Sequence, residues 1–129
     1  MATTSGDRTA AQRTRIAVVA IAVMLLGQFV VGALTAARLT VTHDEFWHIP
    51  VGLLNWKTAR FDLEPLNPPL LRMWATWPLL LTSAESPRTE PTTDLGRFGD
   101  EFLAANRANY DRYVFLARLP IVLLTVAAG

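Results

Sequence analysis

Residues 16–37, IAVVAIAVMLLGQFVVGALTAA, decide the fold class of this chain because they contain no charged side chain. An α-helix over this range would be roughly 33 Å long, enough to cross the hydrocarbon core of a bilayer. We therefore predict that residues 16–37 form a transmembrane helix. Gln28 is the strongly polar side chain within it, and its simplest role is a contact with a neighbouring helix.

The composition of the whole chain agrees with a membrane protein. Hydrophobic residues make up 51% of the 129 residues, which is high for a soluble domain of this length. The formal net charge of +1 gives no large field of one sign, so we expect no nucleic-acid partner. The chain has no cysteine, which excludes disulfides and thiolate chemistry.

The residues on either side of the apolar run indicate its orientation. Residues 1–15 are polar and lack an apolar period, so we expect a disordered tail. This tail carries Arg8, Arg13 and Arg15, whereas only Arg38 directly follows the run. The positive-inside rule then places the N-terminus in the cytoplasm of a bacterial-type plasma membrane and residues 38–112 outside it. A cleaved signal peptide is the alternative, although the apolar run exceeds the usual length of such a segment.

Two surface helices are expected within the extracytoplasmic loop, at about residues 43–59 and 68–81. Thr42 and Glu45 fit the S/T-x-x-E capping box, which predicts the start of the first helix. The pair Pro68-Pro69 starts the second, since proline is tolerated in a first turn. We expect both helices to lie on the membrane surface, anchored by the tryptophans Trp47, Trp56, Trp74 and Trp77. A buried re-entrant segment is the alternative for the second helix.

The first surface helix carries the chain's dense cluster of chemically capable side chains, namely Asp44, Glu45 and His48. The zinc-protease motif H-E-x-x-H is excluded, because His43 and His48 are five residues apart and the glutamate is misplaced. Asp44 and His48 are four apart and could share a divalent cation such as Mg²⁺ or Mn²⁺, although two ligands are too few for a complete site. A hard cation held by one or two carboxylates and bridged to a substrate phosphate is a further alternative. Alternatively, Asp44 and Glu45 only complement the helix dipole.

The remainder of the chain completes an all-α membrane protein. Residues 82–111 are predicted to be a polar, water-exposed crossing that becomes helical from about Gly99, with Phe98, Phe102 and Tyr110 packing it back on the surface helices. Residues 113–129 are apolar apart from Arg118. From Val114 a helix would be roughly 24 Å long, which is short of a full span. We therefore expect an incomplete second transmembrane helix and a chain that is a fragment.

Two blocks of this loop carry a resemblance to a known family. DEFWHIPVG, followed by NPPLLRMWATWPLL, is similar to the first extracytoplasmic loop of the protein O-mannosyltransferase-like glycosyltransferases of the GT-C fold. The matching positions are Asp44, Glu45, His48 and Gly52 in the first block, and Pro68, Pro69, Leu70 and Pro78 in the second. Asn67 stands where the family often has histidine, and Arg72 where lysine is frequent. The resemblance covers residues 16 to about 81.

The resemblance implies the N-terminal part of a GT-C fold and an inverting glycosyl transfer outside the cytoplasm. The donor would be a polyprenyl-phosphate-linked sugar and the acceptor a hydroxyl of a protein or glycan. Asp44 would accept the acceptor's proton, and Glu45 would position the acceptor or a metal, or cap its helix. His48, Asn67 and Arg72 would bind substrate, although Arg72 could instead be a snorkelling interfacial arginine. Family members continue through many more helices, so the fragment is expected to be inactive alone.

A second hypothesis belongs to a different class of protein. The chain could be a small signal-anchored membrane protein whose tryptophan-rich helices bind lipid or a partner protein without catalysis. Sugar transfer that depends on Asp44 separates the two hypotheses.

Overall fold

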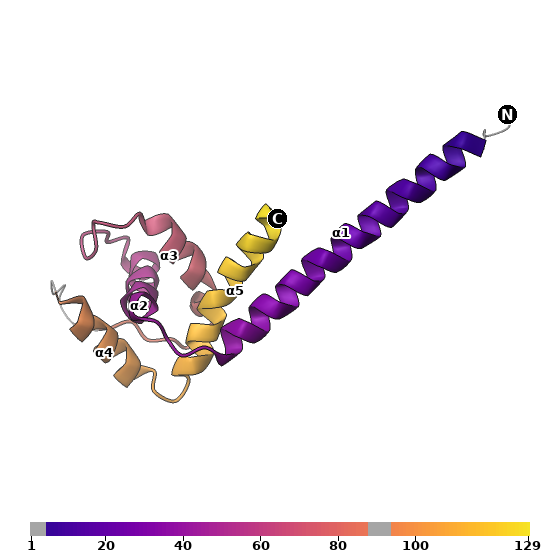
Figure 1. Ribbon diagram of the computed structural model, residues 1–129. Coiled ribbons are helices and arrows are strands. Elements are labelled where there is room, and N and C mark those ends of the chain that lie inside the picture. The colour runs from indigo at the N-terminus through magenta and orange to yellow at the C-terminus, as the bar shows by residue number, and fades with distance from the viewer. Residues whose placement is uncertain (1–4, 88–93) are drawn as a thin grey trace.

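The computed structural model describes residues 5–87 and 94–129, and within these ranges every regular element is a helix (Figure 1). The elements are α1 (Ser5–Arg38), α2 (His43–Thr58), α3 (Pro69–Thr76), the 3₁₀ helix η1 (Trp77–Leu81), α4 (Leu95–Ala105) and α5 (Tyr110–Ala128). The prediction of an all-helical protein is confirmed. Helices α2 to α5 gather at the C-terminal end of α1, whose N-terminal part projects away from them (Figure 1).

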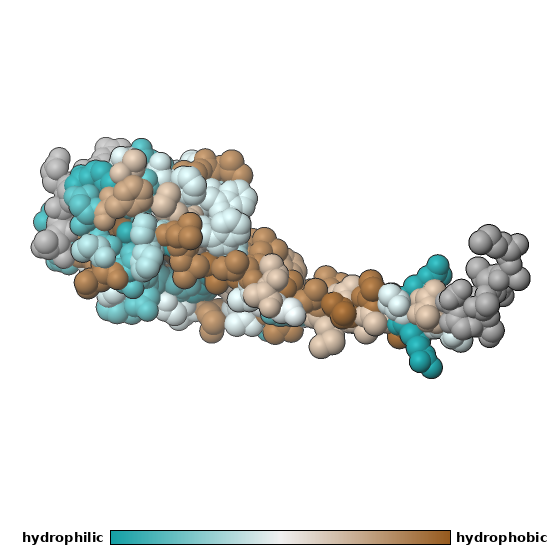
Figure 2. All heavy atoms as spheres, turned by 90° about the horizontal axis from the view of Figure 1, so that it is seen from above, coloured by the Kyte–Doolittle hydropathy of each residue, from teal (hydrophilic) through white to brown (hydrophobic). Residues whose placement is uncertain are grey.

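Helix α1 contains the whole predicted span and is apolar along most of its length (Figure 2). Residues Thr9–Arg38 are long and apolar enough to cross a membrane, and none of the most apolar window is buried against the rest of the chain. A signal sequence near the N-terminus would share these properties. The structure therefore supports one helix suited to membrane insertion, while its orientation stays a prediction.

The N-terminal tail differs from its prediction. Residues 5–15 are helical rather than disordered, because α1 begins at Ser5; residues 1–4 of the predicted tail lie outside the described residues. The physical reason is propagation: once the apolar segment is helical, each added residue gains a backbone hydrogen bond, and the alanines, glutamine and arginines here favour the helix. The hydroxyl of Thr14 donates to the Ala10 carbonyl at 3.1 Å within this extension.

Helix α5 returns alongside α1 and runs antiparallel to it. Gln28 of α1 donates through Nε2 to the Thr125 carbonyl at 3.2 Å, so the predicted contact of Gln28 with a neighbouring helix is confirmed. A Cβ added at Gly32 would lie 2.8 Å from a methyl carbon of Val122, which shows how closely the two helices approach. Helix α5 begins at Tyr110, three residues before the predicted start of the second apolar segment.

Helix α2 has the predicted bounds but different surroundings. The capping box of Thr42 and Glu45 is present, and the helix ends where Ala59 adopts a left-handed conformation with φ of 53°. Val51 and Leu53 of α2 are fully buried by other helices of the chain, so protein rather than lipid covers these two residues, while the placement of α2 on the membrane surface stays a prediction. Pattern alone shows that a helix has an apolar face but not whether protein or lipid covers it.

Helix α3 and η1 together confirm the predicted helix at about residues 68–81. The chain tightens from α-helix to 3₁₀ helix at Trp77, beside Pro78, which has no N–H to donate. Large apolar side chains on this segment remain exposed, among them Leu70 at 77% and Leu81 at 81%. The Trp74 indole donates to the Pro120 carbonyl at 3.0 Å, which ties α3 to α5.

Helix α4 begins at Leu95, earlier than the predicted Gly99, because the Asp94 side chain accepts a hydrogen bond from the Arg97 N–H at 3.1 Å and caps it. Phe98 and Phe102 are fully buried, so the predicted packing of this segment onto the other helices is confirmed. The other face of α4, with Arg97 and Asp100, is exposed as expected for this crossing, while residues 88–93 of it lie outside the described residues.

Candidate functional site

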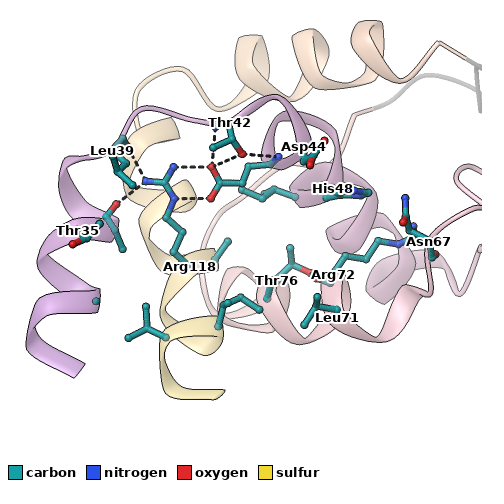
Figure 3. Close-up of a pocket in the computed structure, with 18 of the residues that line it drawn as sticks. Thr35, Leu39, Thr42, Asp44, His48, Asn67, Leu71, Arg72, Thr76 and Arg118 are labelled. Carbon is teal, nitrogen blue, oxygen red and sulfur yellow. Dashed lines mark hydrogen bonds and ion pairs between the residues drawn. The ribbon is translucent and has the colours of Figure 1, made fainter. Parts of the chain in front are cut away.

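A pocket of about 610 Å³ lies on one side of α5, between α1 and α3, and the first turns of α2 close its upper end (Figure 3). The five residues that the sequence singled out all line this pocket: Asp44, Glu45, His48, Asn67 and Arg72. The lining also includes the apolar residues Gly32, Leu71, Ala75, Ile121 and Val122, and on α1 and α5 these lie about one turn further from α2 than Ala36 and Arg118. The fold thus gathers the predicted site residues at the polar end of a mainly apolar cavity.

Arg118 is a pocket residue whose partners the sequence did not reveal. Its guanidinium pairs with both carboxylate oxygens of Glu45, through Nε to Oε1 and Nη2 to Oε2, each at 2.7 Å. The remaining N–H groups donate to the carbonyls of Ala36, Leu39 and Thr40 at 2.6, 2.8 and 2.9 Å. These bonds account for all five guanidinium donors. Arg118 therefore caps the C-terminal end of α1 and fastens α2 to it.

The Glu45 carboxylate, like the Arg118 guanidinium, is held by hydrogen bonds within the chain. Besides the two bonds from Arg118, its carboxylate accepts hydrogen bonds from the N–H and hydroxyl of Thr42, at 2.9 and 3.1 Å. Burial raises the pKa of Glu45, but the hydrogen bonds from Arg118 and Thr42 outweigh burial, so the pKa lies below its ordinary value. These contacts make Glu45 a helix-capping and positioning residue rather than a free proton acceptor.

Asp44 differs from its neighbour because its carboxylate is exposed and has no hydrogen bond or ion pair with any described residue. His48 follows one helical turn later at the same end of the pocket (Figure 3). The Nδ1 atom of His48 is buried and finds no partner in the part of the chain that the structure describes. Asp44 and His48 are thus the polar groups at this end that are left to interact with a ligand.

The residues present suit a metal only in a limited way. Within residues 5–87 and 94–129, no group of three or more histidine or carboxylate side chains could hold a metal ion. Asp44 and His48 supply two donors, too few for a structural zinc site. A hard cation such as Mg²⁺ often uses one or two carboxylates with substrate oxygens, and Asp44 supplies one such carboxylate.

Arg72 is buried rather than snorkelling, so the interfacial alternative for this side chain is wrong. It is 5% exposed, forms an ion pair with Glu64, and donates from Nε to Oδ1 of Asn55 at 2.8 Å. The same Glu64 carboxylate accepts from the backbone and side-chain nitrogens of Asn67 at 3.1 and 3.0 Å. This network fixes the turn that leads into α3 and presents Asn67 to the pocket.

The charges around the pocket are balanced except at Asp44. Arg118 is neutralised by Glu45, and Arg72 by Glu64, so Asp44 carries the unmatched charge among the described residues that line the pocket. Fold and site together define an all-helical protein with one long apolar N-terminal helix and a polar-capped apolar pocket beside it. No protein-family model, curated protein or solved structure matches the chain.

Proposed function

We propose that the chain is the N-terminal portion of an integral-membrane inverting glycosyltransferase, which moves a sugar from a polyprenyl-phosphate carrier to an acceptor hydroxyl outside the cytoplasm. The observation that carries this proposal is the unpaired Asp44 carboxylate at the polar end of the pocket. The ordered similarity of residues 44–52 and 67–78 to the first loop of the GT-C family supports the same assignment. Arg72 is paired with Glu64 and Arg118 with Glu45, so neither arginine is left to pair with the Asp44 carboxylate.

In the proposed reaction, this chain contributes one proton transfer, which involves Asp44. The acceptor O–H donates to the Asp44 carboxylate and gives up its proton as the acceptor oxygen forms a bond to the anomeric carbon. The bond from that carbon to the phosphate oxygen breaks at the same time, and its electron pair leaves with the phosphate. Glu45 and Arg118 keep the first turn of α2, and therefore Asp44, fixed against the end of α1.

The phosphate needs positive charge opposite it as the bond breaks. Arg72 is unsuited to this role, since its charge is already matched by buried Glu64. A divalent cation held by Asp44 and His48 together with phosphate oxygens would supply that charge. Otherwise the charge comes from residues outside this pocket.

The test is sugar transfer by membranes of cells that express the complete gene, with a radiolabelled polyprenyl-phosphate sugar as donor. Asp44→Asn keeps the size of the side chain and removes its basicity, so transfer should fall by at least roughly 100-fold, as expected for loss of a general base. Asp100→Asn is the matched control, because Asp100 is an exposed carboxylate on α4 outside the pocket. Normal transfer by Asp44→Asn, at equal abundance in the membrane, would reject the proposal.

A small signal-anchored membrane protein without catalysis is the second candidate. The exposed apolar side chains of α3 and η1, including Leu70 and Trp74, favour it because they suit a lipid or protein partner. Absence of transfer by the wild-type protein, with lipid binding retained, would support this candidate over the enzyme.

A further inference from the structure

We propose that the pocket binds the hydrocarbon chain of an amphiphile whose head group bears a hydroxyl and is uncharged or positively charged. This amphiphile is the acceptor of the sugar, an identification that rests on the proposed function. The acceptor would then be a membrane-borne alcohol rather than a side chain of a soluble polypeptide.

The apolar end of the pocket carries the first part of this inference. Leu71 and Ala75 of α3 and Ile121 and Val122 of α5 line this end of the pocket, and Gly32 borders it on α1, where an added Cβ would lie 2.8 Å from Val122. A volume of about 610 Å³ lies in the range of pockets that enclose most of a small ligand. The polar side chains nearest to this end are those of Thr35 and Thr76, and the Thr76 hydroxyl already donates to the Arg72 carbonyl at 2.8 Å. An alkyl chain needs no polar partner, whereas a peptide backbone needs several.

The apolar end is also continuous with the outer surface of the protein. Val31 and Leu34 lie on the same turns of α1 as the pocket residue Gly32, and they are 65% and 52% exposed. Leu71 lines the pocket and is itself 57% exposed. A chain in the pocket would therefore extend onto the apolar surface of α1 that is suited to lipid.

The charges at the polar end select the head group. Arg118 donates hydrogen bonds to Glu45 and to three backbone carbonyls at the C-terminal end of α1, and Arg72 is buried and paired with Glu64. Among the described pocket residues, no arginine is left to bind a phosphate, while Asp44 repels one. A hydroxyl donates to Asp44 instead, and an ammonium group is attracted by it. We expect an anionic head group to bind roughly tenfold less well, in line with like-charge repulsion near a protein surface.

The experiment uses the 129-residue chain reconstituted in phosphatidylcholine nanodiscs. Three probes share one alkyl chain with a terminal diazirine and differ in the head group, which is maltoside, 2-hydroxyethyl-dimethylammonium or phosphate. After irradiation, labelled positions are mapped by mass spectrometry. The maltoside and hydroxyethylammonium probes should label the apolar pocket residues of α3 and α5, and the phosphate probe should label them roughly tenfold less.

Two variants and their controls make the result specific. Asp44→Asn should abolish the discrimination against phosphate, and because Asp44 is exposed and unpaired the variant should keep its fold; Asp100→Asn should keep the discrimination. Ala75→Trp fills the pocket and should prevent its labelling by every probe. Ala20→Trp, on an exposed part of α1 outside the pocket, should leave labelling unchanged.

Equal labelling of the pocket by all three probes would overturn the proposed head group. Labelling spread evenly along α1, or crosslinks between two copies of the chain in place of probe adducts, would overturn the amphiphile as occupant. The outcome is separable from that of the proposed function. Charge-selective labelling with normal sugar transfer by Asp44→Asn would reject only the proton-transfer role, whereas lost transfer with unselective labelling would reject only the amphiphile class.

Discussion

Asp44 and Glu45 are adjacent in the sequence, but their surroundings give them different roles. Glu45 points its oxygens at Arg118 and at the start of its own helix, whereas Asp44 is left without a partner among the described residues. The Glu45 carboxylate therefore stabilises the fold, whereas the neighbouring Asp44 carboxylate is available for a ligand. The distinction depends on Arg118, which lies 73 positions further along the chain.

The lowered pKa of Glu45 predicts how stability depends on acidity. Because the folded-state pKa is below the ordinary value of 4.5, the ionised carboxylate stabilises the folded chain above about that pH. This contribution is lost as the pH falls through the lowered value. Unfolding temperature, followed by tryptophan fluorescence in detergent, should therefore decrease on acidification below pH 4.5.

Glu45→Gln removes this titration. At neutral pH the variant should lose about 1–2 kcal/mol, because the pair is partly exposed and worth less than a buried one. Its unfolding temperature should depend less on acid than that of the wild type. Glu101→Gln, which breaks an exposed pair with Arg97 on α4, is the control and should change little. An unchanged acid dependence in Glu45→Gln would show that other groups control it.

The buried pair of Arg72 and Glu64 gives a second prediction. Arg72→Met leaves the Glu64 carboxylate buried without its cation and should cost about 3–5 kcal/mol. Replacing both residues, as in Arg72→Met with Glu64→Gln, should cost less than the sum of the single changes. The measurement is a double-mutant cycle of unfolding free energies in denaturant. Additive single effects would indicate that the two side chains are not coupled.

Five residues that line the pocket could be predicted from the sequence, but their contacts with distant residues could not. Asp44, Glu45 and His48 stood out as a cluster of chemically capable side chains, Asn67 and Arg72 were added by the resemblance to the GT-C family, and the structure brings all five together. The pairing of Arg118 was missed because contacts between distant segments leave no local pattern. A charged residue within an otherwise apolar segment was the available signal, since such a residue needs a partner.

At the scale of elements, the close approach of α2 and α3 depends on Gly52. A Cβ at this position would lie 2.6 Å from the Arg72 carbonyl oxygen and 2.7 Å from Oγ1 of Thr76. The backbone oxygen cannot move without moving α3, so Gly52→Ala should push the helices apart and cost about 1–3 kcal/mol. The measurement is the unfolding midpoint in denaturant, monitored by fluorescence of the tryptophans on these helices.

Gly27→Ala is the matched control for that substitution. A Cβ at Gly27 meets no atom within 4 Å, so the change should leave the unfolding midpoint unchanged or raise it through better helix propensity. Equal effects of the two substitutions would show that the loss of glycine flexibility, and not the contact with α3, determines stability.

Element boundaries were predictable where a local signal marks them. The capping box located the start of α2, and the proline pair located the start of α3. The start of α4 was missed because the capping role of Asp94 lies in a polar stretch with many similar residues. The burial of α2 could not be predicted, because the residues that cover it come from η1, α4 and α5.

At the scale of the whole molecule, both proposals place the pocket on the outer side of the membrane. Helices α1 and α5 run antiparallel, so the turn after α4 lies near the C-terminal end of α1, where the pocket has its polar end (Figure 1). Three arginines precede the apolar run of α1, which favours retention of that end in the cytoplasm. The orientation of one helix thus decides the compartment in which Asp44 lies.

Single-cysteine labelling measures this orientation without background, because the chain has no cysteine of its own. A membrane-impermeant maleimide should label Ala108→Cys, in the exposed turn before α5, in intact cells. It should label Ala11→Cys, at the exposed start of α1, only after permeabilisation. Loss of the Ala11 position from the mature protein would instead identify a cleaved signal peptide. The reverse labelling pattern would put Asp44 in the cytoplasm and reject transfer to an extracytoplasmic acceptor, because the proton-accepting carboxylate and that acceptor would then be separated by the bilayer.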